Sequence, residues 1–167
     1  MRSTSLSPSS TAHRLLLIGL LSSLELLALL TVVQPAEART PPETCTYSTY
    51  AWHVEKRRAV DHDTIRKPYS EVSAGERCPK DERCTVCEED QVWVKVKGIP
   101  RVRVCHAWAE DVRAALEKTS ASSFEVRQIE GYRPGRTRGR VVSGKRTGWS
   151  NHAFGVAVDL NRGQNGL

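Results

Sequence analysis

The stretch from Trp149 to Asn161 constrains the fold more tightly than any other part of the chain. It places the imidazole of His152 seven residues before the carboxylate of Asp159. If both side chains bind one Zn²⁺, each places a donor atom about 2.0–2.2 Å from the metal, so the two must converge. A fully extended segment of this length would span roughly 23 Å. The chain must therefore turn between them, and Gly155 is the residue that can turn at the least steric cost.

The residues around this pair form a longer pattern. After the turn, Val156-Ala157-Val158 predicts a short buried strand that delivers Asp159 from a rigid element. A His and an Asp at this spacing carry little information alone, because a core strand that ends in a surface turn gives the same pattern. The whole run, however, reads Ser150-x-His152-x-x-Gly155-x-Ala157-x-Asp159, and it is preceded by Gly131-Tyr132-Arg133.

These two runs resemble, in the same order, the motifs of the zinc D-alanyl-D-alanine carboxypeptidases of the VanY type and of their Hedgehog-like relatives among cell-wall metallopeptidases. The resemblance covers residues 124–167. It implies an α+β fold of the Hedgehog/D-Ala-D-Ala-peptidase type, with an antiparallel sheet and packed helices. It also implies a zinc cofactor and the hydrolysis of peptide bonds in peptidoglycan stem peptides.

The resemblance further implies roles for individual residues. His152 and Asp159 match two of the metal ligands. Arg133 would be the catalytic residue that stabilises the substrate carbonyl or carboxylate, and Ser150 would bind near the substrate's terminal carboxylate. Two arginines that follow in the sequence compete with Arg133 for its role, Arg136 and Arg138.

The sequence departs from the family pattern at its end. In that family the third ligand, a second His, and an acidic general base lie further along the chain, whereas this sequence ends eight residues after Asp159. Three explanations fit this departure: the metallopeptidase-like core is truncated at its C-terminus, an upstream His replaces the missing ligand, or the protein is a non-catalytic relative. The upstream histidines that follow the predicted signal peptide are His53, His62 and His106, for which structural or surface roles are the more common.

Residues 1–38 have the features of a secretory signal peptide. Arg2 and Arg14 form a positive region, residues 15–33 are almost wholly apolar, and Ala36-Glu37-Ala38 offers a small-x-small cleavage site. An uncleaved anchor is the alternative, but Glu25 within the apolar run makes a stable membrane span costly. We therefore expect an exported protein, periplasmic or secreted, that meets a membrane only through this segment if it stays uncleaved.

The rest of the chain has the size of one domain. We divide it into a cysteine-containing N-terminal segment, residues 39–90, and a metallopeptidase-like core, residues 91–167, within that same domain. The net charge of +6 suits an approach to the carboxylate-bearing cell wall. Because export disfavours nucleic acid as a partner, we expect peptidoglycan peptides as the partner, no nucleic acid, and a monomer.

All five cysteines follow the predicted signal peptide. In an oxidising compartment they favour disulfides, which benefit a small domain because its core is limited. A four-cysteine zinc site would require two closely spaced pairs, and the sequence offers one, Cys84-Thr85-Val86-Cys87. Since five is odd, one thiol is left without a partner, which suggests a missing downstream cysteine. The disulfide candidates are Cys45, Cys78, Cys84, Cys87 and Cys105.

Periodicity predicts three elements of the core. Valines alternate with charged or aromatic residues on both sides of Gly98-Ile99-Pro100, which predicts a β-hairpin over residues 92–104. A strand is also expected over residues 124–129. Residues 107–118 change to helical spacing. The apolar face of that helix consists of Trp108, Val112, Ala115 and Leu116.

Three other stretches show no clear period. Residues 45–67 mix aromatic and charged side chains, and residues 69–90 have the composition of a polar loop held by cross-links. Residues 131–149 carry six arginines and lysines among glycines. We interpret this segment as a cationic loop that grips a peptide carboxylate, because guanidinium groups bind carboxylates in a bidentate manner.

The sequence therefore predicts a zinc metallopeptidase, either a D-Ala-D-Ala carboxypeptidase or an L-Ala-D-Glu endopeptidase. The main alternative is a non-catalytic, secreted cell-wall binding module with the same fold. A third interpretation is a disulfide-rich protein without a metal, in which Asp159 only ends a strand. Zinc content separates the first from the other two.

Overall fold

The computed structural model describes residues 39–164, and the predicted signal peptide lies outside these residues. From Thr40 onward the described chain belongs to one unit. No helix within residues 39–164 has the length and apolar character that a membrane crossing requires.

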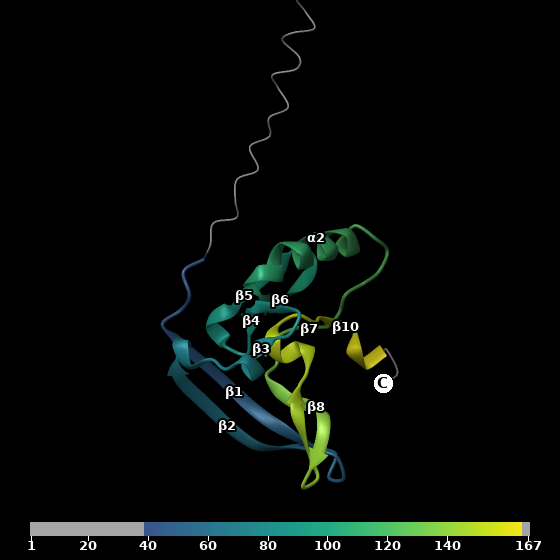
Figure 1. The fold of residues 1–167 in the computed structure, drawn as a ribbon. Coiled ribbons are helices and arrows are strands. Elements are labelled where there is room, and N and C mark those ends of the chain that lie inside the picture. The colour runs from purple at the N-terminus through teal and green to yellow at the C-terminus, as the bar shows by residue number, and fades with distance from the viewer. Residues whose placement is uncertain (1–38, 165–167) are drawn as a thin grey trace, which may run out of the picture. The chain divides into compact units, whose positions relative to one another are not determined.

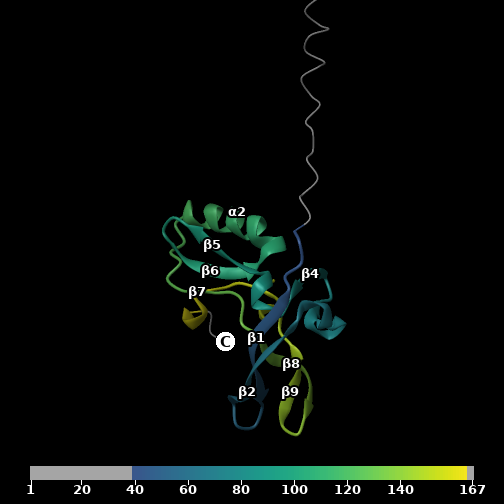
Figure 2. The same ribbon diagram turned by 90° about the vertical axis from the view of Figure 1, so that its left-hand side faces the viewer.

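The largest sheet has four strands in the order β2-β1-β8-β9 (Figures 1 and 2). Strand β1 (Thr44–His53) pairs antiparallel with β2 (Arg58–Pro68) and parallel with β8 (Gly135–Val142). Strand β8 pairs antiparallel with β9 (Lys145–Trp149). The contact between β1 and β8 brings the N-terminal half of the domain beside the segment that leads to His152.

The predicted α+β fold with an antiparallel sheet and packed helices is wrong. Strands account for 46% of the structure and helical turns for 25%, and residues 39–164 contain a single α-helix, α2 (Ala109–Ser120). The other helical segments are 3-10 turns. The strands divide among four small sheets rather than one, and β1 and β8 run parallel. The physical reason is that the apolar residues divide between two clusters: α2 covers one hairpin in one of them, and the other is built around the two disulfides without an α-helix.

The predicted hairpin and helix are confirmed. Strand β5 (Gln91–Val96) pairs antiparallel with β6 (Ile99–Cys105), and α2 packs on this hairpin, as Figure 2 shows. The helix begins two residues later than expected, because a 3-10 turn, His106–Trp108, precedes it. Ala109 and Leu116 are therefore buried against the hairpin valines, whereas Ala115, expected on the apolar face, is exposed.

The polar segment before this hairpin contains short elements rather than an open loop. Three 3-10 turns, Tyr69–Glu71, Ala74–Glu76 and Glu88–Asp90, flank β3 (Arg77–Cys78) and β4 (Asp81–Thr85). Two disulfides tie the segment to its neighbours, Cys45–Cys87 to β1 and Cys84–Cys105 to β6. The expected cross-links are confirmed, and Cys78 is the free cysteine among the described residues, with 2% exposure.

Two strands predicted near the candidate site lie elsewhere. Strand β7 is only Ile129–Glu130, so most of residues 124–129 is unpaired, and its partner β10 is Asp159–Leu160 rather than residues 156–158. The backbone of Val156 turns back to donate to the Asn151 carbonyl, at 3.2 Å. Residues 156–158 therefore cross between elements without a strand partner, and pairing starts at Asp159.

The predicted cationic loop over residues 131–149 is in fact mostly the β8–β9 hairpin. Ser143 and Gly144 form its turn with φ values of 49° and 76°. Such left-handed pairs fit the twist of two-residue hairpin turns. The sequence shows no alternation of apolar and polar residues here, because both faces of the hairpin are largely exposed. Even Val141 and Val142 are exposed.

The described unit has two apolar clusters. The first, which we call the disulfide core, contains both disulfides together with Tyr47, Val86, Ala153 and Phe154. The second, the valine core, lies between α2 and the β5–β6 hairpin. Its buried members are Val94, Val102, Val104, Ala109 and Leu116. The two cores meet along the segment that carries His152 and Asp159.

Candidate functional site

The segment from Trp149 to Leu160 is anchored in both cores. Ala153 and Phe154 are buried in the disulfide core, while Val158 and Leu160 pack against the valine core. His152 lies on the 3-10 turn Asn151–Phe154, and Asp159 begins β10. Each side chain is therefore delivered by residues that are themselves fixed by packing, as a functional constellation requires.

Gly155 joins the two anchored parts, and the expected turn there is confirmed. Its φ is +69°, in the left-handed region, and its carbonyl accepts a 3.0 Å bond from the Cys105 amide. A Cβ at this position would overlap the side-chain oxygen of Gln91 and lie 2.5 Å from the Cys105 nitrogen. Only glycine fits both the conformation and the space.

The structure brings His152 and Asp159 together. His152 Nε2 lies 3.2 Å from Asp159 Oδ2, and the His152 side chain is 13% exposed. On its other side, His152 Nδ1 lies 2.8 Å from the Gly131 carbonyl oxygen. Because a carbonyl oxygen only accepts, Nδ1 carries a hydrogen, and in the neutral ring Nε2 presents its lone pair. Two electron-rich atoms then face each other unless a proton or a metal cation lies between them.

This geometry fits two ligands of one metal ion. Donor atoms about 2.0–2.2 Å from a tetrahedral zinc lie roughly 3.4 Å apart, close to the observed 3.2 Å. A backbone carbonyl that fixes the second nitrogen of a ligating His is also the usual outer partner in metal sites. A catalytic zinc normally has three protein ligands, however. Within residues 39–164 no group of three His, Cys, Asp or Glu side chains is placed to hold a metal.

None of the upstream histidines joins this pair. His53 is buried and accepts a bond from the Lys56 amide at 3.3 Å, and His62 stacks on Tyr50 with ring centroids 5.8 Å apart. His106 Nδ1 lies 3.2 Å from the Asp90 carbonyl oxygen. The described contacts of all three are structural.

Arg133 lies beside the pair. Its backbone amide donates to the His152 carbonyl at 2.9 Å, and its Nη1 donates to Glu130 Oε2 at 2.8 Å. Glu130 is the residue opposite Asp159 in the β7–β10 register, so the two side chains share one face of the pair of strands. Arg162 also contacts Glu130, at 3.2 Å. Glu130 was missed by the sequence analysis, although it immediately precedes Gly131-Tyr132-Arg133.

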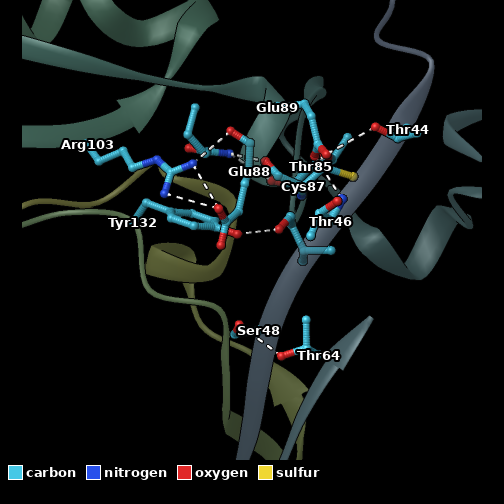
Figure 3. Close-up of polar contacts among 12 residues, drawn as sticks. Thr44, Thr46, Ser48, Thr64, Thr85, Cys87, Glu88, Glu89, Arg103 and Tyr132 are labelled. Atoms are coloured by element: carbon cyan, nitrogen blue, oxygen red, sulfur yellow. Dashed lines mark hydrogen bonds and ion pairs between the residues drawn. The ribbon is translucent and has the colours of Figure 1, made fainter. Parts of the chain in front are cut away.

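Tyr132 fixes the position of this run. Its hydroxyl donates to the Val86 carbonyl at 2.6 Å, and its amide donates to the Arg103 carbonyl at 2.7 Å. Figure 3 shows the Arg103 side chain beside the Tyr132 ring, 5.1 Å from the ring centroid, where it also pairs with Glu88. Burial raises the pKa of Tyr132 well above its usual range, so the hydroxyl stays a donor.

Ser150 and His152 share a hollow of about 500 Å³. Ser150 is 7% exposed, and Arg138 lines the same hollow. The full lining is Arg138, Trp149, Ser150, Asn151, His152 and Ala157. We call it the His152 hollow. It joins a predicted metal ligand, a predicted substrate-binding residue and one of the arginines that compete with Arg133.

Comparisons with protein-family models, with curated proteins and with solved structures gave no match. The resemblance to the cell-wall metallopeptidases therefore rests on the two sequence runs alone.

Proposed function

We propose that this protein is an exported zinc-dependent peptidase that hydrolyses peptide bonds in peptidoglycan stem peptides, as a D-Ala-D-Ala carboxypeptidase or an L-Ala-D-Glu endopeptidase. One observation carries the proposal. His152 Nε2, with its other nitrogen bonded to a carbonyl, faces Asp159 Oδ2 at 3.2 Å, the spacing of two ligands on one metal ion.

The export of the protein has independent support. Two disulfides fit an exported protein, since such bonds persist in oxidising compartments. The proposal places it in the periplasm or outside the cell, where its net charge of +6 attracts it to a wall rich in carboxylates.

In this proposal, each residue of the site has its own role. His152 and Asp159 would hold the zinc, which when bound polarises a scissile carbonyl and lowers the pKa of a water. Ser150 and Arg138, in the His152 hollow, would bind the terminal carboxylate of the substrate through a hydroxyl and a guanidinium. Arg133, oriented by Glu130, would direct its remaining N–H groups at the carbonyl oxygen.

A second candidate is a cell-wall binding module without catalysis. The observation in its favour is that His152 and Asp159 have no third ligand beside them within residues 39–164. In this alternative the basic surface and the hollows bind stem peptides, and the His152–Asp159 pair is held by a proton.

Product analysis separates the two candidates. The purified chain is incubated with zinc and with a stem pentapeptide that ends in D-Ala-D-Ala, and the products are identified by mass spectrometry. Cleavage at a defined bond that is lost in His152→Ala and kept in His62→Ala supports the peptidase. Binding of the peptide without cleavage would reject it in favour of the binding module.

A further inference from the structure

Trp149 also lines a second hollow, separate from the His152 hollow. Its volume is about 660 Å³, in the range of ligand sites. Its apolar wall is formed by Trp149 and Phe154, and its charged wall comes from β2, the turn at Ala74–Glu76, β3 and β8. We call it the basic hollow. Its charged members are Lys67, Glu76, Arg77 and Arg136.

The charges in this hollow do not cancel. Lys67 is neutralised by Glu76, whose carboxylate lies 2.6 Å from the Lys67 ammonium. Arg77 donates to the Glu82 carbonyl at 3.3 Å, a neutral acceptor. Among the ion pairs of residues 39–164, none includes Arg77 or Arg136. Within residues 39–164, two guanidinium groups therefore line the hollow without an ion pair to a carboxylate. Arg136 also lines a neighbouring hollow that contains Asp61 and Asp63.

Arg136 is held in a conformation that suits an anion. It is the cross-strand partner of Trp149, and its guanidinium carbon lies 4.9 Å from the centroid of the indole ring. Stacking occupies the face of the guanidinium and leaves its N–H edge free to bind a carboxylate in a bidentate manner. Trp149 itself is fixed by an edge contact with Tyr47, with centroids 6.0 Å apart.

Trp149 lines both hollows, so one extended ligand can reach both. We infer that the basic hollow is a subsite for a substrate carboxylate that lies away from the scissile bond, with Arg136 as its main ligand. This inference rests on the proposed function and adds a specificity determinant to it. The substrate class it selects is a peptide with an anionic residue three positions from its reacting C-terminal residue, such as a γ-linked D-glutamate with a free α-carboxylate.

The test compares two peptides that differ by one charge. The probes are L-Ala-γ-D-Glu-L-Lys-D-Ala-D-Ala and the same peptide with the glutamyl α-carboxylate converted to an amide. Binding to the purified chain is measured by isothermal titration calorimetry at low salt, with a chelator present so that the peptides stay intact. The expected preference for the acid is about tenfold, as for one charge-assisted contact.

Two variants test whether the preference for the acid peptide comes from the basic hollow. Arg136→Gln removes the guanidinium, and Arg140→Gln makes the same change of charge on the same strand, outside the lining of the hollow. Both residues are exposed, so the fold should tolerate both changes. The preference for the acid is expected to vanish in Arg136→Gln and to persist in Arg140→Gln.

The outcomes separate the inference from the proposed function. Equal binding of the acid and the amide by the unmodified chain would overturn the subsite and leave the peptidase proposal standing. An equal loss of preference in both variants would also overturn it, because the effect would then come from the overall charge. Failure of the chelated chain to bind either peptide would overturn the subsite, whereas the peptidase proposal is decided separately by the cleavage assay with zinc.

Discussion

Gly155 packs against Gln91 so closely that no side chain fits between them. Gln91 is 8% exposed and donates its amide to the carbonyls of Thr85 and Cys87, at 3.1 and 3.2 Å, so it cannot easily move aside. The contact fixes the turn that brings His152 back toward Asp159.

This contact predicts that Gly155→Ala is strongly destabilising. A left-handed conformation costs alanine about 1–2 kcal/mol and overpacking adds about 1–3 kcal/mol, so a loss of roughly 2–5 kcal/mol in unfolding free energy is expected. Urea denaturation measures it. Gly75→Ala is the control, since a Cβ there meets only the Ser73 hydroxyl, at 3.9 Å. A Gly155→Ala variant as stable as this control would show that the turn differs from the one described.

The disulfide pairing predicts the behaviour of the thiols. Cys45–Cys87 and Cys84–Cys105 leave Cys78 free and buried. Iodoacetamide should therefore label no cysteine of the folded chain and one cysteine of the unfolded, unreduced chain. Replacing Cys84 and Cys105 together by serine should cost about 2–5 kcal/mol. Peptide mapping that finds Cys78 in a disulfide would contradict this pairing.

The lowered pKa of Glu76 predicts that the fold loses stability in acid. Burial raises its pKa, but hydrogen bonds from Lys67, Tyr47 and Ser73 outweigh burial and lower the pKa from 4.5 to about 2. A carboxylate with a lowered pKa in the folded state stabilises the fold above pH 4.5, and this contribution is lost as pH falls from 4.5 toward 2.

Glu76→Gln should therefore lower the unfolding free energy at pH 7 by roughly 1–3 kcal/mol, because it removes a charged acceptor from buried partners. The difference from the unmodified chain should shrink between pH 4.5 and 2. The control is Glu55→Gln, at an exposed position in the turn after β1. A difference that stays constant down to pH 2 would argue against an ionised Glu76 in the network.

Glu130 is expected to act through Arg133 rather than on the metal. Glu130→Gln removes the 2.8 Å ion pair that orients the guanidinium and leaves His152 and Asp159 in place. We expect kcat/KM for the stem pentapeptide to fall about tenfold with zinc content unchanged. Glu125→Gln, which breaks the exposed pair with Arg127, serves as the matched control. Loss of zinc from Glu130→Gln would instead make Glu130 a ligand.

The sequence predicts the fold best where the pattern is carried by strongly apolar residues. The hairpin of Val94, Val102 and Val104 is such a case. Strand β1 also buries alternate positions, Cys45 and Tyr47 before a register shift and Ala51 and His53 after it, but cysteine, alanine and histidine give little hydrophobic contrast, so the period is hidden. The β8–β9 hairpin has no apolar face, and its one signal is the Ser143-Gly144 turn.

In the candidate site, too, local features could be predicted from the sequence, whereas contacts between distant segments could not. The approach of His152 to Asp159 and the turn at Gly155 lie within one short segment, and they are expected from the run Ser150–Asp159 together with the metal site that its resemblance implies. The opposition of Glu130 and Asp159 depends on the register between β7 and β10, which pairs residues distant in the sequence. The basic hollow depends on β1 lying beside β8, a parallel pairing that no local pattern encodes.

The central claim is that a metal ion joins His152 and Asp159, and zinc stoichiometry tests it most directly. Elemental analysis of the purified chain should find about one zinc per chain, and His152→Ala and Asp159→Asn should each lose it, while His62→Ala should keep it. A chain without zinc after equilibration with the metal, or one in which all three variants retain it, would contradict the claim and leave the pair held by a proton.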